Sequence, residues 1–268
     1  MKWRFLDTGI MDGALNMAVD EAILMAQAEE RVPPTLRFYR WNPPCFSLGY
    51  FQSAAKEIEL DQLSERGVHL VRRLTGGRAI LHHEEVTYSI ILPEESGLLP
   101  SGVIESYSVL SQGILNALQQ LGLTAQLVKS KPQKGFSAAC FDTPSWYELQ
   151  IEGKKVAGSA QTRRDKVLLQ HGSLPLSTDT DLLFGLLKFS SQEQRERMKR
   201  RFEKKATSIN DELETKVEYD EVKTALFKGW KQTLQLEGEW EELTSWEKNR
   251  ALELKEKKYS SPQWNKRR

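Results

Sequence analysis

The sequence predicts an α+β fold in which a mixed central β-sheet is flanked by helices and followed by a charged, helical C-terminal portion. Short apolar or alternating runs of strand length recur up to residue 174. Helical patterns interrupt these runs without the regular strand–helix alternation of a parallel α/β sheet. Residues 189–268 hold 35 of the 75 charged side chains, which sets this portion apart.

The first half of the chain supplies one long helix and several strands. Within residues 1–29 we expect an N-terminal strand and then a helix, for which Asp12 is placed as the cap. Apolar positions follow helical spacing: Leu15, Val19, Ala22, Ile23 and Ala26. Four strand-like runs follow: Leu36–Trp41, Cys45–Gly49, Leu70–Leu74 and Val86–Leu92.

The second half repeats this pattern and ends in helices. Apolar residues between Tyr107 and Leu121 predict a helix that Gly122 ends. Four further strands are expected: Ala125–Val128, Trp146–Ile151, Lys155–Ala160 and Val167–Leu174. Glu152-Gly153 is a hairpin turn between two of them. The tail is interpreted as surface helices anchored by tryptophans: Trp230, Trp240, Trp246 and Trp264.

Composition narrows the classes of function. The formal net charge is +1, which gives no electrostatic case for nucleic acid or an anionic membrane as partner. No apolar run approaches the roughly 18 residues that span a bilayer, and the N-terminus does not resemble a signal peptide. Two cysteines are too few for a disulfide framework, and four histidines fit no zinc spacing. We therefore expect a cytoplasmic protein with no metal and no cofactor.

The segment from Arg72 to His82, RRLTGGRAILH, is the first candidate site. Its two glycines let backbone N–H groups approach a ligand closely. The arginines and the histidine add donors suited to a phosphate, a carboxylate or a pantetheine-linked phosphodiester. A tight hairpin with exposed arginines is the alternative. The candidate substrate contacts here are Arg72, Thr75, Gly76, Gly77, Arg78 and His82.

The segment GKKVAGSAQ, residues 153–161, is the second candidate. Alternation along the expected strand sends Lys154 and Lys155 to opposite faces, so only one of them can point into a pocket. A solvated lysine pair after a turn is the alternative. The third candidate is Cys140, because its loop of small residues favours access and a neighbouring ammonium would lower the pKa of its thiol. Cys45, at the start of a strand, has no such neighbourhood.

Taken in order, RRLTGGRAILH, GKKVAGSAQ and LLQHGSLPL resemble the lipoate- and biotin-protein ligase superfamily, from NMAVDEAIL near the N-terminus to the closing KYSSPQWN. The resemblance implies an α+β fold with a channel for a medium-chain acyl group. It matches the family's lysine to Lys155, and it adds Gly158, Ser159, Ala160 and His171 as substrate contacts. We expect residues 30–240 to form the catalytic domain, with 1–29 and 241–268 packed on it as one unit.

Two departures separate the chain from the ATP-dependent ligases. Arg78 stands where they usually have a third glycine, and Tyr147-Glu148 replaces their Asn-Asp pair. The segment ACFDTPSWYEL before GKKVAGSAQTR instead resembles the cysteine-dependent octanoyltransferases of the LipM type. That resemblance implies a Cys140 thioester, with Lys155 lowering the pKa of the thiol. The donor would be octanoyl-acyl carrier protein, and the acceptor the glycine cleavage H protein or another lipoyl domain.

Other functions stay open at this point. The chain is alternatively an ATP-dependent lipoate–protein ligase, an amidotransferase that moves octanoyl between lipoyl domains, or a non-catalytic lipoyl-domain binding protein. Two basic segments are candidate contacts for an acidic carrier protein, namely Lys129–Lys134 and the helix at 195–205. The helix is otherwise interpreted as a solvated surface helix with internal ion pairs, rather than as a nucleic-acid patch.

Overall fold

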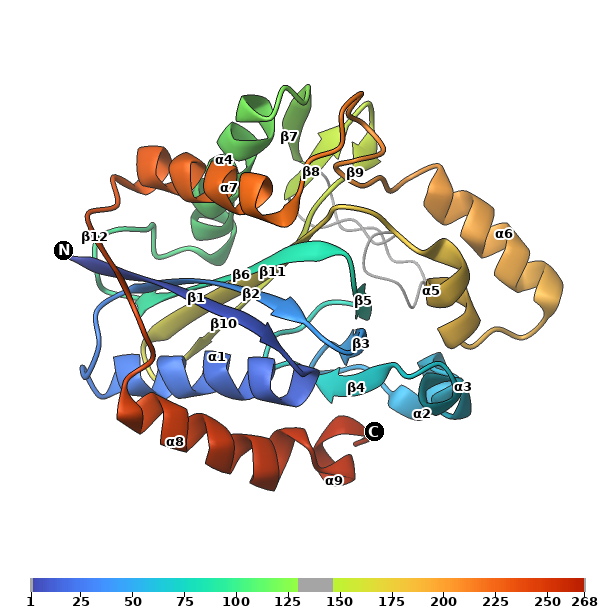
Figure 1. Ribbon diagram of the computed structural model, residues 1–268, viewed down its shortest axis with the longest axis horizontal. Coiled ribbons are helices and arrows are strands. Elements are labelled where there is room, and N and C mark those ends of the chain that lie inside the picture. Colours follow the sequence, from blue (N-terminus) through green and yellow to red (C-terminus); the bar gives the residue numbers. More distant parts are fainter. Residues whose placement is uncertain (1, 130–146, 268) are drawn as a thin grey trace.

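The computed structural model describes residues 2–129 and 147–267. A six-stranded mixed sheet runs through the middle of the molecule (Figure 1). Its order is β10 (Gly158–Arg164), β11 (Val167–Pro175), β6 (Glu85–Pro93), β2 (Thr35–Trp41), β1 (Trp3–Met11) and β12 (Gly238–Glu241). The strands β12, β1 and β2 are parallel, whereas β2, β6, β11 and β10 pair antiparallel. The prediction of a mixed central sheet is confirmed.

Helices cover both faces of this sheet, as expected for two apolar sheet faces. On one face lie α4 (Val103–Gln120) and α7 (Tyr219–Leu234), and on the other α1 (Gly13–Ala28) and α8 (Ser245–Leu254) (Figure 1). The side chains of β2 alternate between these layers. Leu36 and Phe38 belong to the core with α4 and α7, while Tyr39 and Trp41 belong to the core with α1.

Two small sheets extend the fold at one end. The first has the order β4 (His69–Arg72), β3 (Cys45–Leu48), β5 (Ile80–His82), and the second β7 (Ala125–Lys129), β8 (Tyr147–Ile151), β9 (Lys154–Lys155). Four helices surround the first: α2 (Ala54–Glu57), α3 (Leu60–Glu65), α5 (Thr180–Leu186) and α6 (Gln192–Glu203). A third apolar core, which includes Phe46, Phe184 and Phe202, joins them.

The expected single strand Lys155–Ala160 is wrong in one respect. Lys155 ends β9, in the small sheet, whereas Gly158 begins β10, in the main sheet. Val156 and Ala157 between them are buried and belong to the first core. The chain therefore changes sheets directly after Lys155. The expected turn at Glu152-Gly153 is confirmed, and both residues have the positive φ that a tight hairpin turn requires.

The C-terminal portion is helical but is not only a surface layer. Trp230 of α7 is completely buried in the core and anchors the helix on the main body, as expected, while the opposite side of α7 is exposed. Trp240 lies on β12, which was not predicted, and it is 50% exposed. In α8, Glu247 makes a buried ion pair with Arg4 of β1, which ties the helix to the sheet. None of the helices that the structure describes is long and apolar enough to cross a membrane.

Candidate active site

Lys155 is held in place through its backbone and its side chain. Its N–H donates to the Lys205 carbonyl (2.7 Å), and its carbonyl accepts from Thr207 N–H (2.9 Å). Its ammonium lies 3.3 Å from the Glu148 carboxylate, and both side chains are about nine-tenths buried. Lys154 points the other way, is 38% exposed and pairs with Glu212. Alternation thus places Lys155, and not Lys154, in the interior.

A pocket lies beside the strand that follows Lys155, and we call it the inner pocket; it comprises about 340 Å³ of space between atoms, part of which is open to solvent. Four predicted contacts on β10 and β11 line it, namely Gly158, Ser159, Ala160 and His171, together with His82 of β5. Its other walls come from α1, β2, β6 and the 72–78 segment, and include Met17, Tyr39, Trp41, Thr87 and Arg73. The mixture of apolar walls and a few polar groups is typical of a small-molecule site.

Glycine is required at the back of the inner pocket. A Cβ on Gly172 would lie 2.5 Å from Ser159 Oγ and 2.7 Å from a ring carbon of Tyr88. Ser159 Oγ is hydrogen-bonded to Tyr88 Oη (2.8 Å), which fixes the serine against the pocket wall. Any side chain at Gly172 would displace this pair.

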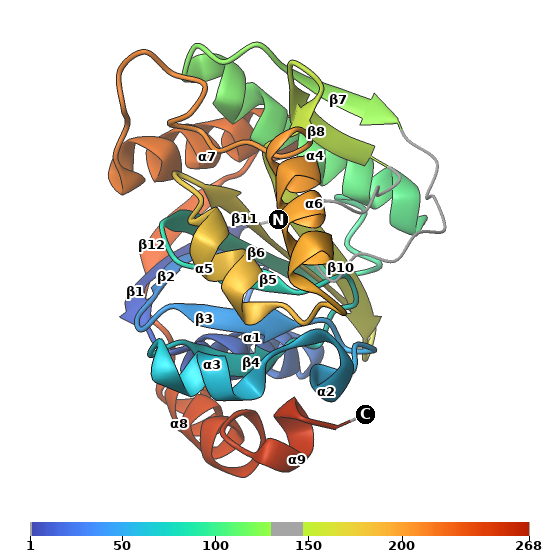
Figure 2. The ribbon, with the colours of Figure 1, turned by 90° about the vertical axis from the view of Figure 1, so that its right-hand side faces the viewer.

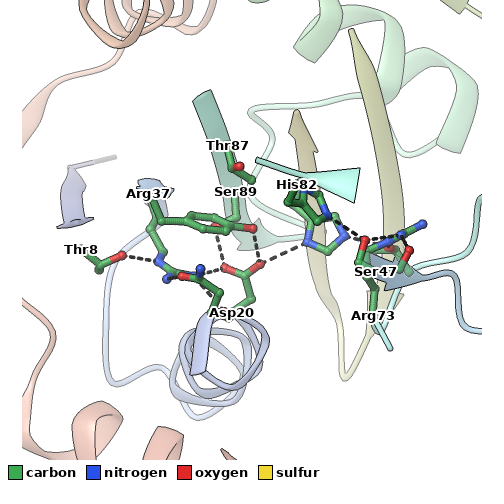
Figure 3. Close-up of polar contacts among 12 residues, drawn as sticks. Thr8, Asp20, Arg37, Ser47, Arg73, His82, Thr87 and Ser89 are labelled. Atoms are coloured by element: carbon green, nitrogen blue, oxygen red, sulfur yellow. Dashed lines mark hydrogen bonds and ion pairs between the residues drawn. The ribbon is translucent and has the colours of Figure 1, made fainter. Parts of the chain in front are cut away.

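A buried chain of polar groups runs from α1 to residues 72–78, which we call the glycine segment (Figure 3). Asp20 pairs with Arg37 (2.7 Å) and accepts from Tyr39 and Ser89. Its other oxygen lies 3.1 Å from His171 Nδ1, and His171 Nε2 lies 2.7 Å from Thr75 Oγ1. Because the carboxylate can only accept, we infer that Nδ1 donates to Asp20 and that Nε2 accepts from Thr75.

A second buried chain reaches the same segment from β6 (Figure 3). Glu85 lies 2.6 Å from His82 Nδ1, and His82 Nε2 lies 2.7 Å from Ser47 Oγ. Ser47 in turn accepts from Arg73 (2.7 Å). The ring of Trp41 stacks on His82 at a centroid distance of 4.0 Å. The two chains of polar groups therefore hold Thr75 and Arg73, both of which lie just before Gly76-Gly77.

The glycine segment has the close backbone contacts that its sequence suggested. A Cβ on Gly49 would lie 2.0 Å from the Gly77 carbonyl oxygen, and Gly77 itself has φ +93°. Arg73 donates to the carbonyls of Gly76 and Arg78, which closes the segment into a rigid turn. No described heavy atom comes within 4 Å of the position of a Gly76 Cβ, so the backbone there is accessible from outside.

Five predicted contacts do not line the inner pocket, namely Arg72, Thr75, Gly76, Gly77 and Arg78, and the side chains of Arg72 and Arg78 are engaged elsewhere. The Arg72 guanidinium is completely buried and donates to backbone carbonyls of the turn after β3 and of the C-terminal segment, among them Gly49, Gln52, Asn265 and Arg267. The side chain of Asn265 in α9 (Pro262–Asn265) also accepts from Arg72 N–H. Arg78 points to Glu57, 3.7 Å away. Arg72 thus attaches the closing KYSSPQWN segment to the fold.

The two cysteines differ in what the structure says of them. Cys45 is completely buried, and burial raises the pKa of its thiol far above the usual range, so it stays protonated. Cys140 lies outside the described residues. Within the described ranges, no group of three or more His, Cys, Asp or Glu side chains is arranged to hold a metal ion.

Sequence reasoning missed several residues of the site. Asp20 and Glu85 were not singled out, although each is a charged residue next to the apolar positions of its element. Glu148 was noted only as a departure from the ligases, yet it is the ion-pair partner of Lys155. A carboxylate within an otherwise apolar stretch of sequence indicates a buried polar partner, because such groups are almost never fully buried unless they are paired.

The two buried chains of polar groups predict how the free energy of unfolding depends on pH. Burial lowers the pKa of His171 from 6.5. Burial alone would raise the pKa of Asp20, but the Arg37 charge and hydrogen bonds from His171 and Ser89 outweigh it and lower that pKa from 3.8. A lowered folded-state pKa gives stability that is complete above the unfolded-state pKa and is lost as the pH falls.

We therefore expect the free energy of unfolding to fall in two stages. Below pH 6.5 the unfolded chain protonates His171 first, which costs up to about 1.4 kcal/mol per pH unit. The carboxylates add to the loss below about pH 4.5. Denaturant titrations between pH 5 and 8 measure the first stage. His171→Gln should flatten it and His83→Gln, at an exposed histidine, should not; equal slopes in all three proteins would contradict the assignment.

Comparison with known proteins places these features in a family. Residues 12–231 match the family model described as the lipoyl protein ligase A/B catalytic domain. An octanoyltransferase LipM from Brevibacillus brevis is 48% identical over 274 residues, covering 100% of this chain and 99% of that protein. The octanoyltransferase LipM of Bacillus subtilis is 45% identical over 273 residues, covering 99% and 98%.

Solved structures agree with this placement. The bipartite lipoate protein ligase of Thermoplasma acidophilum superimposes with a TM-score of 0.82 at 27% identity, covering 99% of this chain and 96% of that one. A lipoate-protein ligase A bound with ATP gives 0.81 at 28% identity, covering 99% of both chains. With its fold, its glycine segment and its buried lysine in the order that the resemblance required, the chain belongs to the lipoyl protein ligase A/B catalytic-domain family.

Proposed function

We propose that this protein is an octanoyltransferase of lipoate biosynthesis, which moves an octanoyl group from octanoyl-acyl carrier protein to a lysine of a lipoyl domain through a thioester on Cys140. The observation that supports this most is identity of 45–48% over essentially the whole chain to proteins named octanoyltransferase LipM. The inner pocket, with mostly apolar walls, is the proposed site of the acyl chain.

The first half of the proposed reaction is thioester exchange. The Cys140 thiolate attacks the octanoyl carbonyl carbon, a new carbon–sulfur bond forms, and the bond to the carrier thiol breaks. The departing thiolate takes up a proton. Because one thioester replaces another, the step needs no external source of free energy. A free cysteine is only a few per cent thiolate at pH 7, so the step depends on a nearby positive charge.

The second half forms an amide. The neutral amine of the acceptor lysine attacks the acyl-enzyme, a carbon–nitrogen bond forms, and Cys140 leaves as a thiolate. The acceptor ammonium, with an ordinary pKa of about 10.4, must first lose a proton. An amide is more stable than a thioester, so this half makes the overall transfer favourable.

Lys155 is the proposed partner of Cys140 in both halves. Its ammonium is held in the interior by Glu148, so it is placed by the fold rather than by substrate. There it would stabilise the thiolate as an ion pair, assist loss of the acceptor's proton and donate to the developing oxyanion. The octanoyl chain would pass along Gly158–Ala160 into the inner pocket, past His82 and His171.

The acceptor and the setting belong to the same proposal. The Thermoplasma acidophilum ligase is described together with its E2 lipoyl domain. We propose that this chain also acts on a lipoyl domain, with the glycine cleavage H protein as the first candidate. A free catalytic thiol requires a reducing compartment, which favours the cytoplasm. Residues 30–240 are proposed to hold the catalytic residues, with 1–29 and 241–268 packed on them as one unit.

Intact-mass measurement tests the covalent intermediate. The purified protein is incubated with octanoyl-acyl carrier protein in the absence of ATP. We expect an added octanoyl group that hydroxylamine removes, since hydroxylamine cleaves thioesters. Cys140→Ala should abolish the adduct, whereas Cys45→Ala should keep it, because the buried Cys45 thiol is protonated.

The competing functions give different results. Turnover that requires free lipoate and ATP, and survives Cys140→Ser, would identify an ATP-dependent ligase. An adduct formed only from octanoyl-H protein would identify an amidotransferase. Absence of both adduct and turnover would leave a binding protein.

A further inference from the structure

A second cavity adjoins the inner pocket and has no part in the proposal so far. It comprises about 530 Å³ of space between atoms, part of which is open to solvent, and we call it the outer cavity. Ile80 of β5 lines both cavities, so one side chain contributes to both walls. The outer cavity lies where β5 meets α5 and α6, which stand in front of that strand in Figure 2.

The walls of the outer cavity combine apolar surface with a polar rim. Leu183 of α5, Phe202 of α6 and Pro175 of β11 give the apolar part, and Ser177, Thr178 and His83 lie among the polar residues. Ala79, Ile80 and Leu81 form another wall. Because β5 is an edge strand of its sheet, backbone groups on its outer side can pair with the amides of an extended ligand. Such a cavity suits a narrow chain that contains amide bonds.

The outer cavity is directly connected to the proposed catalytic lysine. Ala206 and Thr207 line the cavity, and Ala206 forms a parallel β-bridge with Lys155. The Thr207 N–H donates to the Lys155 carbonyl (2.9 Å). A chain that lies in the cavity would therefore end close to Lys155, while the inner pocket begins at Gly158 on the other side.

The acidic residues that line the cavity are Glu84, Glu85 and Asp179, whereas basic charge lies beside the cavity, on α6. Seven of the twelve residues from Gln194 to Lys205 are Lys or Arg and two are Glu. This stretch is most of α6, whose Phe202 faces the cavity. The arginines of the glycine segment are, by contrast, already engaged: Arg73 with Ser47, Gly76 and Arg78, Arg72 with the C-terminal segment, and Arg78 with Glu57. Lys199 of α6 is also paired, with Asp181. A phosphodiester that stays outside the cavity is nevertheless better matched by the other cations of α6 than by Arg72–Arg78.

We infer that the outer cavity receives the uncharged pantetheine part of the phosphopantetheine arm of the acyl donor, with its amides along β5 and the phosphodiester outside the cavity, beside α6. This inference rests on the proposed function and names the part of the donor that the cavity binds. The thioester at the end of the arm would then lie between the two cavities, next to Lys155, with the octanoyl chain in the inner pocket. Binding energy from the arm would be used to accelerate acylation.

A series of octanoyl thioesters tests this assignment. The donors are octanoyl-mercaptoethanol, octanoyl-pantetheine and octanoyl-phosphopantetheine, and the rate of acyl-adduct formation on the enzyme is followed by intact mass. In the wild type, we expect kcat/KM for acylation to rise by about 100-fold from the first donor to the last, because remote binding contributes to the transition state.

Two variants fill the cavity from different sides. Thr178→Trp blocks its rim and Ala206→Leu its wall, and either should reduce the gain in kcat/KM from the arm to a few-fold. Thr178→Trp should leave the rate with octanoyl-mercaptoethanol unchanged, whereas Ala206→Leu, at the bridge to Lys155, is compared only by the ratio of the rates with the different donors. Gln192→Trp, on the exposed start of α6, is the matched control and should keep the full gain. If Ala206→Leu fails to fold, Thr178→Trp, at a half-buried rim position, still decides the question.

The possible outcomes distinguish failure of the proposed function from failure of the assignment of the outer cavity. Absence of an adduct from every donor in the wild type would overturn the proposed function itself. An adduct whose dependence on the arm is unchanged in both filled variants would overturn only the assignment of the cavity. A defect of the filled variants that is confined to transfer from the acyl-enzyme to the lipoyl domain would also overturn the assignment, because the cavity would then bind the acceptor lysine.

Discussion

The Lys155→Met variant is expected to lose acyl transfer by about 10³-fold, the size of effect found when a positioned proton donor and its charge are removed together. Methionine keeps most of the length and apolar volume of the lysine side chain. The change therefore tests the ammonium rather than the packing around it. Single-turnover acylation from octanoyl-acyl carrier protein, measured by quenching and intact mass, gives the rate of the first half-reaction directly.

The pH profile of the variant separates a chemical role from a structural one. If the ammonium stabilises the Cys140 thiolate, the residual acylation rate of Lys155→Met should rise with pH up to the ordinary thiol pKa of about 8.5. The wild type should reach its plateau at lower pH. An unchanged profile in the variant would contradict the ion pair, whatever the loss in rate.

Matched variants control for the Glu148 negative charge, which remains in the Lys155→Met variant. Removal of the ammonium takes an ion-pair partner from the buried Glu148 carboxylate, which is itself destabilising. The double variant Lys155→Met with Glu148→Gln removes both charges and should recover stability without recovering activity. Lys154→Met, at the neighbouring and 38% exposed lysine, should keep activity within about twofold because a surface charge has little effect.

The second large effect is expected on stability. Asp20→Asn should lower the free energy of unfolding by about 3–5 kcal/mol, because it leaves the completely buried Arg37 charge without a carboxylate. The amide also places a donor at one of the two oxygen positions: either at Oδ2, which accepts from His171 and Tyr39, or at Oδ1, which accepts from Arg37 and Ser89. Asparagine has nearly the same shape, so the loss reports charge and hydrogen bonding rather than a cavity.

Urea unfolding followed by circular dichroism measures this difference, and a melting temperature about 10 °C lower is the calorimetric equivalent. Glu29→Gln is the control, because Glu29 pairs with Arg31 at the surface and its loss should cost less than about 0.5 kcal/mol. A change of under 1 kcal/mol in Asp20→Asn would show that the buried chain contributes little to folding.

Some elements followed from sequence because their cause is local. The Asp12 cap is confirmed by the Leu15 N–H that donates to its side chain, and the helix it begins depends only on spacing and propensity. The turn at Glu152-Gly153 is likewise determined by two neighbouring residues. By contrast β12 was missed, since its four residues are all exposed and show no alternation, and its place is decided by pairing with β1.

Sequence by itself determined the fold class, because strand and helix patterns follow from spacing along the chain. It also determined the choice of Lys155 over Lys154, but through the resemblance to the family's motif, since alternation showed only that the two side chains point to opposite faces. Only the tertiary structure decided which of the charged residues meet. Arg72 and Arg73 are neighbours in sequence, yet one attaches the C-terminal segment and the other the glycine segment. Asp20 and His171 are 151 residues apart and in contact. Burial makes such contacts necessary, because a buried charge must find its partner wherever the fold places it.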